Sequence, residues 1–290
     1  MPKLMIFSRE ADEYQQRIES AHLPALELTT DPDTCDIVLG EPKLIKNAFP
    51  LLSALKWVQS VYAGVEPLVD LVQRRDYILT NARGVFGESM SEYVFGYILF
   101  HEKRILERMR AQQAKQWQRH ESGILPGKTI GLLGVGSIGA HLAGTAKHFR
   151  MTVRGFTRES ETSTAVDQYY HGNDLPAFAD GLDYLVSILP KTKDTDQLVD
   201  ARLLKALPPR AVFINVGRGN AVDELALVEA LREGKLAAAM LDVFEKEPLP
   251  EAHPFWTTPN LYMTFHTAAI SYPEDLVKLF AENYQLYIAG

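Results

Sequence analysis

Three polar residues of different chemical types follow predicted strands: Arg218, Glu247 and His266. The strands are expected, in the same order, at 211–216, 237–243 and 261–265. The carboxyl ends of parallel strands meet at one edge of an open sheet, where such sheets bind ligands, so we expect these side chains to border one site. A cation to polarise an oxygen, an imidazole to exchange a proton and a carboxylate to hold the imidazole suit hydride transfer at a carbonyl carbon.

Each of these residues also has an ordinary structural interpretation. A histidine at a strand end often only stabilises the fold, Arg218 can cap nearby carbonyl groups, and Glu247, which precedes a proline, suits a surface turn. Their joint occurrence in a chain that also carries a glycine-rich nucleotide motif favours a chemical site.

That glycine-rich motif follows an apolar strand expected at 129–133. Gly134, Gly136 and Gly139 form the pattern G-x-G-x-x-G, and a helix is expected at 138–149. The first glycine permits a tight turn, the second leaves room for a pyrophosphate, and the third lets the helix pack closely on the strand. Because the amino end of a helix favours anions, the stretch predicts a dinucleotide site. A glycine-rich turn without a ligand is the alternative.

The next strand indicates which dinucleotide is bound. It is expected at 152–156 and leads into Thr157 and Arg158, where NAD-binding sheets of this kind carry an acidic residue for the ribose 2′-hydroxyl. A hydroxyl and a guanidinium instead suit a 2′-phosphate, so we expect NADP(H) in preference to NAD(H). Glu159 and Glu161 leave NAD(H) as the alternative cofactor, since a shift of register would put an acidic residue at the position that contacts the ribose 2′-hydroxyl.

The composition excludes several classes of protein. The chain has 290 residues, of which 46% are hydrophobic and 23% charged, which suits a globular protein of about two domains. A formal net charge of -7 argues against sequence-independent binding of nucleic acid. Cys35 is the only cysteine, so we expect no internal disulfide, no structural zinc site and a cytoplasmic location. Neither a signal peptide nor a membrane-spanning run is recognisable.

Short apolar strands alternate with helical segments along most of the chain. This alternation predicts an α/β protein with two Rossmann-like or flavodoxin-like domains, each a doubly wound parallel sheet, with a cleft between them. We expect a substrate-binding domain over 1–95 and 267–290 and a dinucleotide-binding domain over 96–266. Two of the expected helices lie at 67–73 and 90–114.

Several motifs occur in an order that resembles the D-isomer-specific 2-hydroxyacid dehydrogenase family, and more narrowly its glyoxylate/hydroxypyruvate reductase branch. Besides the glycine pattern they are residues 62–66, 189–195, 215–219 with 222–224, 241–243 with 247–248, and 264–269. The resemblance covers nearly the whole chain. Phe265 and Glu66 depart from it, because the family usually has proline and aspartate at these places.

The resemblance implies a role for each group of residues. Arg218, Glu247 and His266 would be the catalytic residues, with His266 as the proton donor. The substrate would be bound by Arg218 and the backbone at Ala63, Gly64 and Val65. The cofactor would contact Gly134, Gly136, Ser137, Ile138, Gly139, Thr157, Arg158, Leu189, Pro190, Thr195, Val216, Gly217 and Asp242. Asp242 would hold the nicotinamide carboxamide, and a buried aspartate that binds nearby backbone is the alternative.

The implied activity is the NADP(H)-preferring reduction of a small 2-keto acid, such as glyoxylate or hydroxypyruvate, to the D-2-hydroxy acid. Relatives are generally homodimers, and residues 101–117 are candidates for the interface. A formate dehydrogenase-like enzyme is one alternative, which Glu247 disfavours because those enzymes carry glutamine there. A non-catalytic, NAD(P)-sensing protein that resembles a corepressor is the other.

Overall fold

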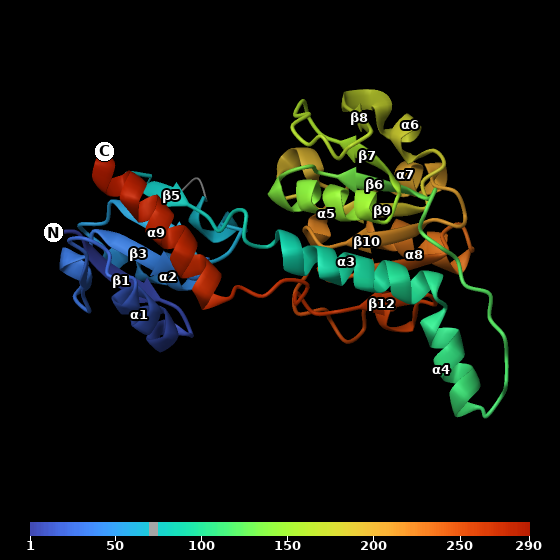
Figure 1. The fold of residues 1–290 in the computed structure, drawn as a ribbon, viewed down its shortest axis with the longest axis horizontal. Helices are drawn as coiled ribbons and strands as arrows, with labels where there is room; N and C mark the ends of the chain where they lie inside the picture. The colour runs from blue at the N-terminus through green and yellow to red at the C-terminus, as the bar shows by residue number, and fades with distance from the viewer. Residues whose placement is uncertain (70–74) are drawn as a thin grey trace. The chain divides into compact units, whose positions relative to one another are not determined.

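The chain forms two compact units (Figure 1). The computed structural model describes residues 1–69 and 75–290. The first unit contains Met1–Val85 and Ile270–Gly290, and the second contains Phe86–Ala269. The first boundary falls at Val85 and not near residue 95, because helix α3 (Gly87–Glu102) contributes its buried side chains to the core of the second unit. The predicted fold class, two parallel-sheet α/β domains, is confirmed.

The first unit is built on a five-stranded parallel sheet with the order β2-β1-β3-β4-β5. Every residue of the central strand β3 is buried, as expected where both faces of a parallel sheet are covered. The strands are β1 (Lys3–Phe7), β2 (Glu27–Leu28), β3 (Ile37–Gly40), β4 (Trp57–Ser60) and β5 (Ile78–Thr80). The α-helices are α1 (Ala11–Ser20), α2 (Pro42–Ala48) and α9 (Pro273–Ala289).

Helix α9 belongs to the first unit although it is the last element of the chain. The ring of Trp57 stacks on that of Phe280, with centroids 5.2 Å apart and planes 2° from parallel, and on that of Tyr287 at 5.1 Å. Asn283 Nδ2 also donates a hydrogen bond of 2.8 Å to Gln59 Oε1. Burial of these large rings explains why the chain returns to its first sheet.

The segment expected as a helix at 67–73 is only partly described. A short 3-10 helix, Glu66–Leu68, forms at its start. Residues 70–74 lie outside the described residues.

The second unit contains a seven-stranded parallel sheet with the order β12-β11-β10-β9-β6-β7-β8. Its strands are β6 (Thr129–Leu133), β7 (Thr152–Phe156), β8 (Gln168–Tyr170), β9 (Tyr184–Ser187), β10 (Val212–Asn215), β11 (Ala238–Leu241) and β12 (Leu261–Met263). Besides α3, its α-helices are α4 (Ile105–Gln113), α5 (Ser137–His148), α6 (Leu175–Ala179), α7 (Ala201–Ala206) and α8 (Glu224–Arg232).

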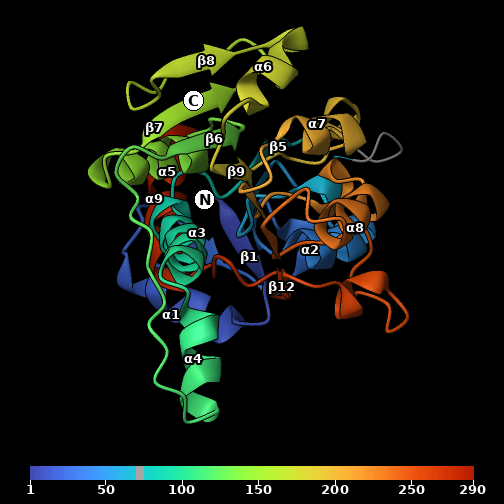
Figure 2. The same cartoon turned by 90° about the vertical axis from the view of Figure 1, so that its right-hand side faces the viewer.

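Helices cover both faces of this sheet and create two apolar cores. Helices α3 and α5 pack on one face, and α6, α7 and α8 pack on the other (Figure 2). The strand order reverses between β6 and β9, because the chain adds β7 and β8 on one side of β6 and the remaining strands on the other. Open α/β sheets bind ligands at the carboxyl ends of their strands near such a reversal.

The single helix expected at 90–114 is wrong. The chain forms α3, then α4, and Arg104 between them adopts a left-handed conformation with φ of 50°. That conformation ends the hydrogen-bond ladder of α3 and turns the chain, so α4 projects from the rest of its unit (Figure 1). Among the described residues, no helix combines the length and the apolar composition needed to cross a bilayer.

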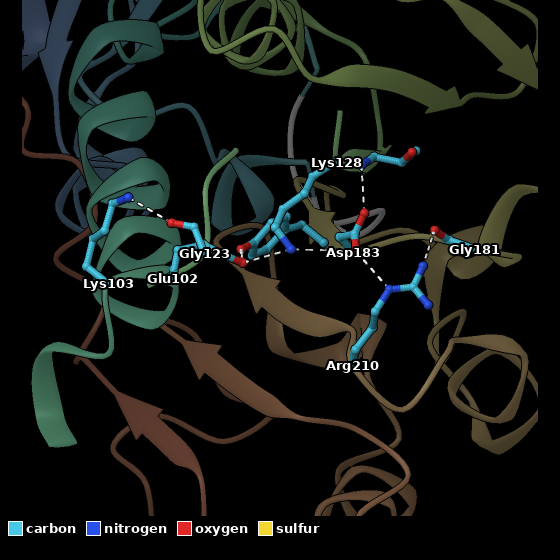
Figure 3. Close-up of polar contacts among 9 residues, drawn as sticks. Glu102, Lys103, Gly123, Lys128, Gly181, Asp183 and Arg210 are labelled. Carbon is cyan, nitrogen blue, oxygen red and sulfur yellow. Dashed lines mark hydrogen bonds and ion pairs between the residues drawn. The ribbon is translucent and has the colours of Figure 1, made fainter. Parts of the chain in front are cut away.

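Residues 105–123, helix α4 and the segment that returns from it, are called the arm below. The ion pair between Glu102 and Lys128 lies where the arm joins the rest of its unit (Figure 3). The Glu102 carboxylate accepts a short hydrogen bond from the Tyr184 hydroxyl and pairs with Lys128 at 3.1 Å. Gly123, in the segment that returns from α4, donates its amide to the Glu102 carbonyl oxygen at 3.0 Å and accepts from Lys103 Nζ at 2.8 Å. Figure 3 also shows the extension of this network through Asp183, Arg210 and Gly181. The arm is therefore anchored to the sheet at both of its ends.

Candidate active site

The structure brings the three predicted chemical side chains to one edge of the second unit. Arg218 follows β10, Glu247 follows β11 and His266 follows β12, and these strands are neighbours in the sheet. All three residues therefore lie beyond the carboxyl ends of parallel strands.

Glu247 and His266 form a hydrogen-bonded pair. Glu247 Oε2 lies 2.8 Å from His266 Nδ1, and Glu247 Oε1 accepts the amide of Phe244 at 3.0 Å. Because a carboxylate only accepts hydrogen bonds, the proton on this side of the imidazole resides on Nδ1. Nε2 is then the ring nitrogen that can exchange a proton with a bound molecule.

The pair changes the pKa of both partners in opposite directions. The hydrogen bond to Glu247 raises the pKa of His266 above its usual value, against the effect of burial. Burial acts to raise the pKa of Glu247, but the hydrogen bonds from His266 and from the Phe244 amide outweigh it and lower that pKa. The side chain of His266 is 53% exposed, so a ligand can reach it. The site thus holds an imidazolium to a higher pH than a free histidine does.

Arg218 is held by the loop after β10. The buried Asn215 donates from Nδ2 to the Arg218 carbonyl oxygen at 3.1 Å and accepts the Gly217 amide on Oδ1 at 3.1 Å. The positive charge of Arg218 acts to lower the pKa of both His266 and Glu247, so the guanidinium influences the ionisation of both partners of the pair. A half-buried cation beside an imidazolium can bind a carboxylate and polarise a carbonyl oxygen.

Asp242 directly follows β11 and is buried, with 2% of its surface exposed. Its carboxylate accepts the amides of Thr267 at 2.8 Å and Ala268 at 3.0 Å, and also the hydroxyl of Thr264 at 2.5 Å. These contacts match the alternative considered for Asp242, an aspartate that binds nearby backbone. The role of Thr264 was not predicted, because the sequence marks this residue only as part of the motif at 264–269.

The glycine loop fits a dinucleotide. Gly134 has a φ of +94°, which a side chain would strain, and a Cβ on Gly139 would lie 2.3 Å from the Gly134 carbonyl oxygen. A Cβ on Gly136, in contrast, would meet no described atom within 4 Å, so open space adjoins the loop at this residue. Helix α5 begins at once with Ser137 and Ile138, whose amides suit a pyrophosphate.

Neighbouring loops contribute the other residues assigned to the cofactor. A Cβ on Gly217 would lie 2.6 Å from the Leu189 amide nitrogen, so the backbones after β9 and β10 approach closely. Thr195 Oγ1 donates to the Pro190 carbonyl oxygen at 2.7 Å and fixes the turn after β9. Val216 is buried in the core of the unit. These residues line the same sheet edge as the glycine loop.

Thr157 and Arg158 follow β7, and the structure adds His171, which follows β8. His171 Nδ1 lies 3.0 Å from the Thr157 carbonyl oxygen, and Nε2 lies 2.8 Å from Glu161 Oε1. Both of these partners only accept hydrogen bonds, so the two contacts favour the doubly protonated, positively charged ring. The hydrogen bond to Glu161, followed by that to Thr157, raises the pKa of His171. No sequence pattern marks His171 as a site residue, since it follows β8, a strand of only three residues that was not predicted.

The turn assigned to the substrate carboxylate lies in the first unit, after β4. Asn81 Nδ2 donates to the Ala63 carbonyl oxygen at 2.8 Å, and the Leu68 amide donates to the Val65 carbonyl oxygen at 2.8 Å. Gly64 lies between these two anchored residues and is partly buried. The carbonyl groups on either side of the turn are therefore fixed within their own unit.

Known proteins are similar to this chain in sequence and in fold. The family model described as D-isomer specific 2-hydroxyacid dehydrogenase, NAD binding domain, matches residues 95–268. The chain is 35% identical over 245 residues to glyoxylate/hydroxypyruvate reductase A of Serratia proteamaculans (strain 568), a match that covers 81% of this chain and 78% of that protein.

Solved structures resemble the whole chain. A D-isomer specific 2-hydroxyacid dehydrogenase family protein from Aeromonas salmonicida subsp. salmonicida A449 is 40% identical with a TM-score of 0.94, covering 100% of this chain and 96% of that one. A D-isomer specific 2-hydroxyacid dehydrogenase from Xanthobacter autotrophicus Py2, solved with NADPH and MES, is 32% identical with a TM-score of 0.90, covering 100% and 95%. This chain therefore belongs to the D-isomer specific 2-hydroxyacid dehydrogenase family of oxidoreductases.

Proposed function

We propose that this protein is an NADP(H)-preferring reductase that converts a small 2-keto acid of the glyoxylate or hydroxypyruvate type to the D-2-hydroxy acid. One observation carries the proposal: the His266–Glu247 pair, with the charge of Arg218 acting on it, lies at the same sheet edge as the glycine loop. A relative 35% identical to this chain is named glyoxylate/hydroxypyruvate reductase A, and a structural relative was solved with NADPH, which supports both the substrate class and the cofactor.

The chain's own residues divide the reaction between them. When bound, the reduced nicotinamide supplies the hydride that adds to C2 of the keto acid. His266 donates the proton on Nε2 to the carbonyl oxygen, while Nδ1 keeps its own proton and donates it in a hydrogen bond to Glu247 Oε2, which keeps the ring oriented. Arg218 pairs with the substrate carboxylate and polarises the carbonyl group. As the hydride forms the new C2–H bond, the electron pair of the carbonyl double bond moves to oxygen, and the proton from His266 converts that oxygen to the hydroxyl group.

We assign the remaining binding functions to the two units by the same reasoning. The second unit would hold the cofactor along its strand edge, with the pyrophosphate at Gly136 and the nicotinamide near Asp242. The first unit would receive the substrate carboxylate on the backbone of Ala63, Gly64 and Val65. The anchored carbonyl groups of this turn support the assignment, because they pre-set its backbone.

We also propose a cytoplasmic location. Cys35, the only cysteine, is buried and forms no disulfide, and burial raises the pKa of its thiol to about 11. A protonated, buried thiol is unreactive and suits a reducing compartment.

We further propose that two copies of the chain pair through the arm. A groove of about 640 Å³, rich in aromatic side chains, is lined by Glu92, Tyr93, Gly96, Tyr97, Phe100, Leu261, Tyr262 and Met263 of α3 and β12. The arm presents the apolar side chains that such a groove needs: Met109 is 50% exposed and Trp117 is 95% exposed. Met109 lies on the projecting helix α4 and Trp117 in the segment that follows it, and large exposed apolar side chains of this kind mark an interaction surface.

His266→Ala should lower kcat for the reduction of glyoxylate or hydroxypyruvate by about a thousandfold, because the alkoxide loses its proton donor. The dissociation constant of NADPH, followed by its fluorescence, should stay within about twofold, since binding to the glycine loop does not need the imidazole. His148→Ala, at the exposed end of α5, is the control and should behave as wild type. Near-normal turnover of His266→Ala would contradict the assignment, and NADPH binding without turnover by wild type on any 2-keto acid would favour a cofactor sensor.

The reductive kcat/KM should fall as the pH rises through the pKa of His266, which lies above the usual value because of Glu247. In Glu247→Gln the charge that stabilises the imidazolium is lost, so the fall should occur at lower pH. The pH profile of both variants in the direction of keto-acid reduction checks this. Glu245→Gln, an exposed neighbour in the same loop, should leave the profile in place, and an unchanged profile in Glu247→Gln would refute the pairing.

Cofactor choice should depend on two cations at the end of the nucleotide site. Arg158→Ala and His171→Ala should each weaken NADPH about tenfold or more and NADH less than about threefold, because only NADPH carries the 2′-phosphate that they bind. Fluorescence titration gives both dissociation constants. Arg202→Ala, an exposed arginine paired with Asp200, serves as the control. Equal losses for the two cofactors would place both cations outside the 2′-phosphate site.

Light scattering should give wild type twice the chain mass of 32.5 kDa. The double variant Met109→Glu with Trp117→Glu should be monomeric, because it replaces two exposed apolar side chains of the arm with charges. Leu286→Glu, on the exposed side of α9 in the first unit, is the control and should remain dimeric. A monomeric wild type at micromolar concentration would rule the pairing out.

A further inference from the structure

We propose that a hydrogen-bond chain from the half-buried Tyr93 and Thr264 to the buried Asp242 positions His266, and that Tyr93 and Thr264 are positioning residues for proton transfer. The inference rests on the proposed function in assigning proton transfer to His266. The hydrogen-bond chain lies entirely within the second unit, so its effect on His266 can be tested without substrate.

The backbone of His266 is in a conformation that its surroundings must impose. Its φ is +59°, in the left-handed region that residues with a side chain rarely occupy. The His266 amide donates to the Asp242 carbonyl oxygen at 2.7 Å, and the amides of Thr267 and Ala268 donate to the Asp242 carboxylate. Three consecutive amides therefore converge on one buried residue. This convergence fixes the direction in which the imidazole leaves the backbone.

Thr264 completes the set of donors to Asp242. Thr264 Oγ1 lies 2.5 Å from Asp242 Oδ1 and 2.6 Å from the Tyr93 hydroxyl oxygen. Because the carboxylate accepts, the single hydroxyl proton of Thr264 is used on Asp242, and its oxygen must accept from Tyr93. The hydrogen bonds therefore all run in one direction: Tyr93 donates to Thr264, and Thr264 donates to Asp242.

Tyr93 is suited to be the permanent donor at the head of this chain. Burial, and with it the negative charge of Asp242, raises the pKa of the Tyr93 hydroxyl, so the group stays protonated. Its ring packs at 4.9 Å from that of Tyr97 on the same helix, which restricts its motion. Helix α3 is thereby connected to the loop that carries His266.

This arrangement gives the Thr264 hydroxyl a function that an apolar side chain cannot supply. Valine has the same shape but no hydroxyl, so it would leave the buried Asp242 Oδ1 without this donor and the half-buried Tyr93 hydroxyl without this acceptor. A relaxed loop would let the imidazole move relative to Glu247 and the substrate. Displacements of about 1 Å in such groups lower catalytic rates by up to about a hundredfold.

The test compares Thr264→Val, Thr264→Ser and Tyr93→Phe with wild type. In Thr264→Val, kcat for keto-acid reduction should fall about 10- to 100-fold, with the dissociation constant of NADPH within about twofold. Tyr93→Phe should lower kcat less, by about threefold to tenfold, because Thr264 can still donate to Asp242. Thr264→Ser keeps the hydroxyl and should restore kcat to within about threefold of wild type.

A second measurement needs no substrate. NMR of 13C-labelled histidine should show the titration midpoint of His266 move to lower pH in Thr264→Val, because the contact with Glu247 is loosened. The charged groups that face this ring are Glu247, Arg218 and Asp242, and none of them is altered by the substitution. Circular dichroism and the oligomeric mass are recorded to verify that each variant is folded and assembled as wild type.

The outcomes separate the two proposals. A midpoint that moves in Thr264→Val and returns in Thr264→Ser supports the positioning chain even if wild type reduces no 2-keto acid, and then the proposed function alone fails. A midpoint and a kcat that stay at wild-type values in both Thr264→Val and Tyr93→Phe would overturn the positioning chain. If Thr264→Val does not fold, Tyr93→Phe decides by the same two readouts.

Discussion

The candidate site depends on one interaction, the convergence of three consecutive amides on Asp242. His266 cannot hold its left-handed backbone without it, and the direction of the imidazole follows from that backbone. Asp242 can serve in this way because it follows a fully buried strand, β11, in the interior of the sheet. The parallel sheet therefore positions the proton donor through an aspartate that is shielded from water, where its hydrogen bonds are strong.

Electrostatics then sets the protonation state of the donor. Glu247 raises the pKa of His266, and Arg218 opposes this effect. A site with the carboxylate alone would hold its proton tightly, whereas the nearby cation favours its release and also attracts an anionic substrate. The three side chains come from adjacent loops of one rigid sheet, so their separations are fixed before any ligand arrives. Such preorganisation is what proton transfer coupled to hydride addition requires.

Sequence patterns predicted the parts of this structure that follow from local chemistry. Continuous apolar runs predicted the central strands, and Arg218, Glu247 and His266 were recognised because each follows such a run. The break at Arg104 escaped prediction, since apolar positions continue at helical spacing on both sides of it. His171 and Tyr93 escaped because their roles arise from contacts across the fold: Tyr93 lies 171 residues from Thr264 in sequence. Local patterns do not encode such pairs, and only the packed sheet brings them together.

The central claim is that a hydride reaches C2 of a 2-keto acid at this edge of the second unit while His266 supplies the proton. Transfer of deuterium from NADPH that carries deuterium at both C4 positions to the product of hydroxypyruvate reduction tests it, with the product examined by mass spectrometry and chiral chromatography. We expect one deuterium on C2 of a D-2-hydroxy acid with wild type, and almost none in the same time with His266→Ala. An unlabelled product, an L-configured product or equal labelling with His266→Ala would contradict it.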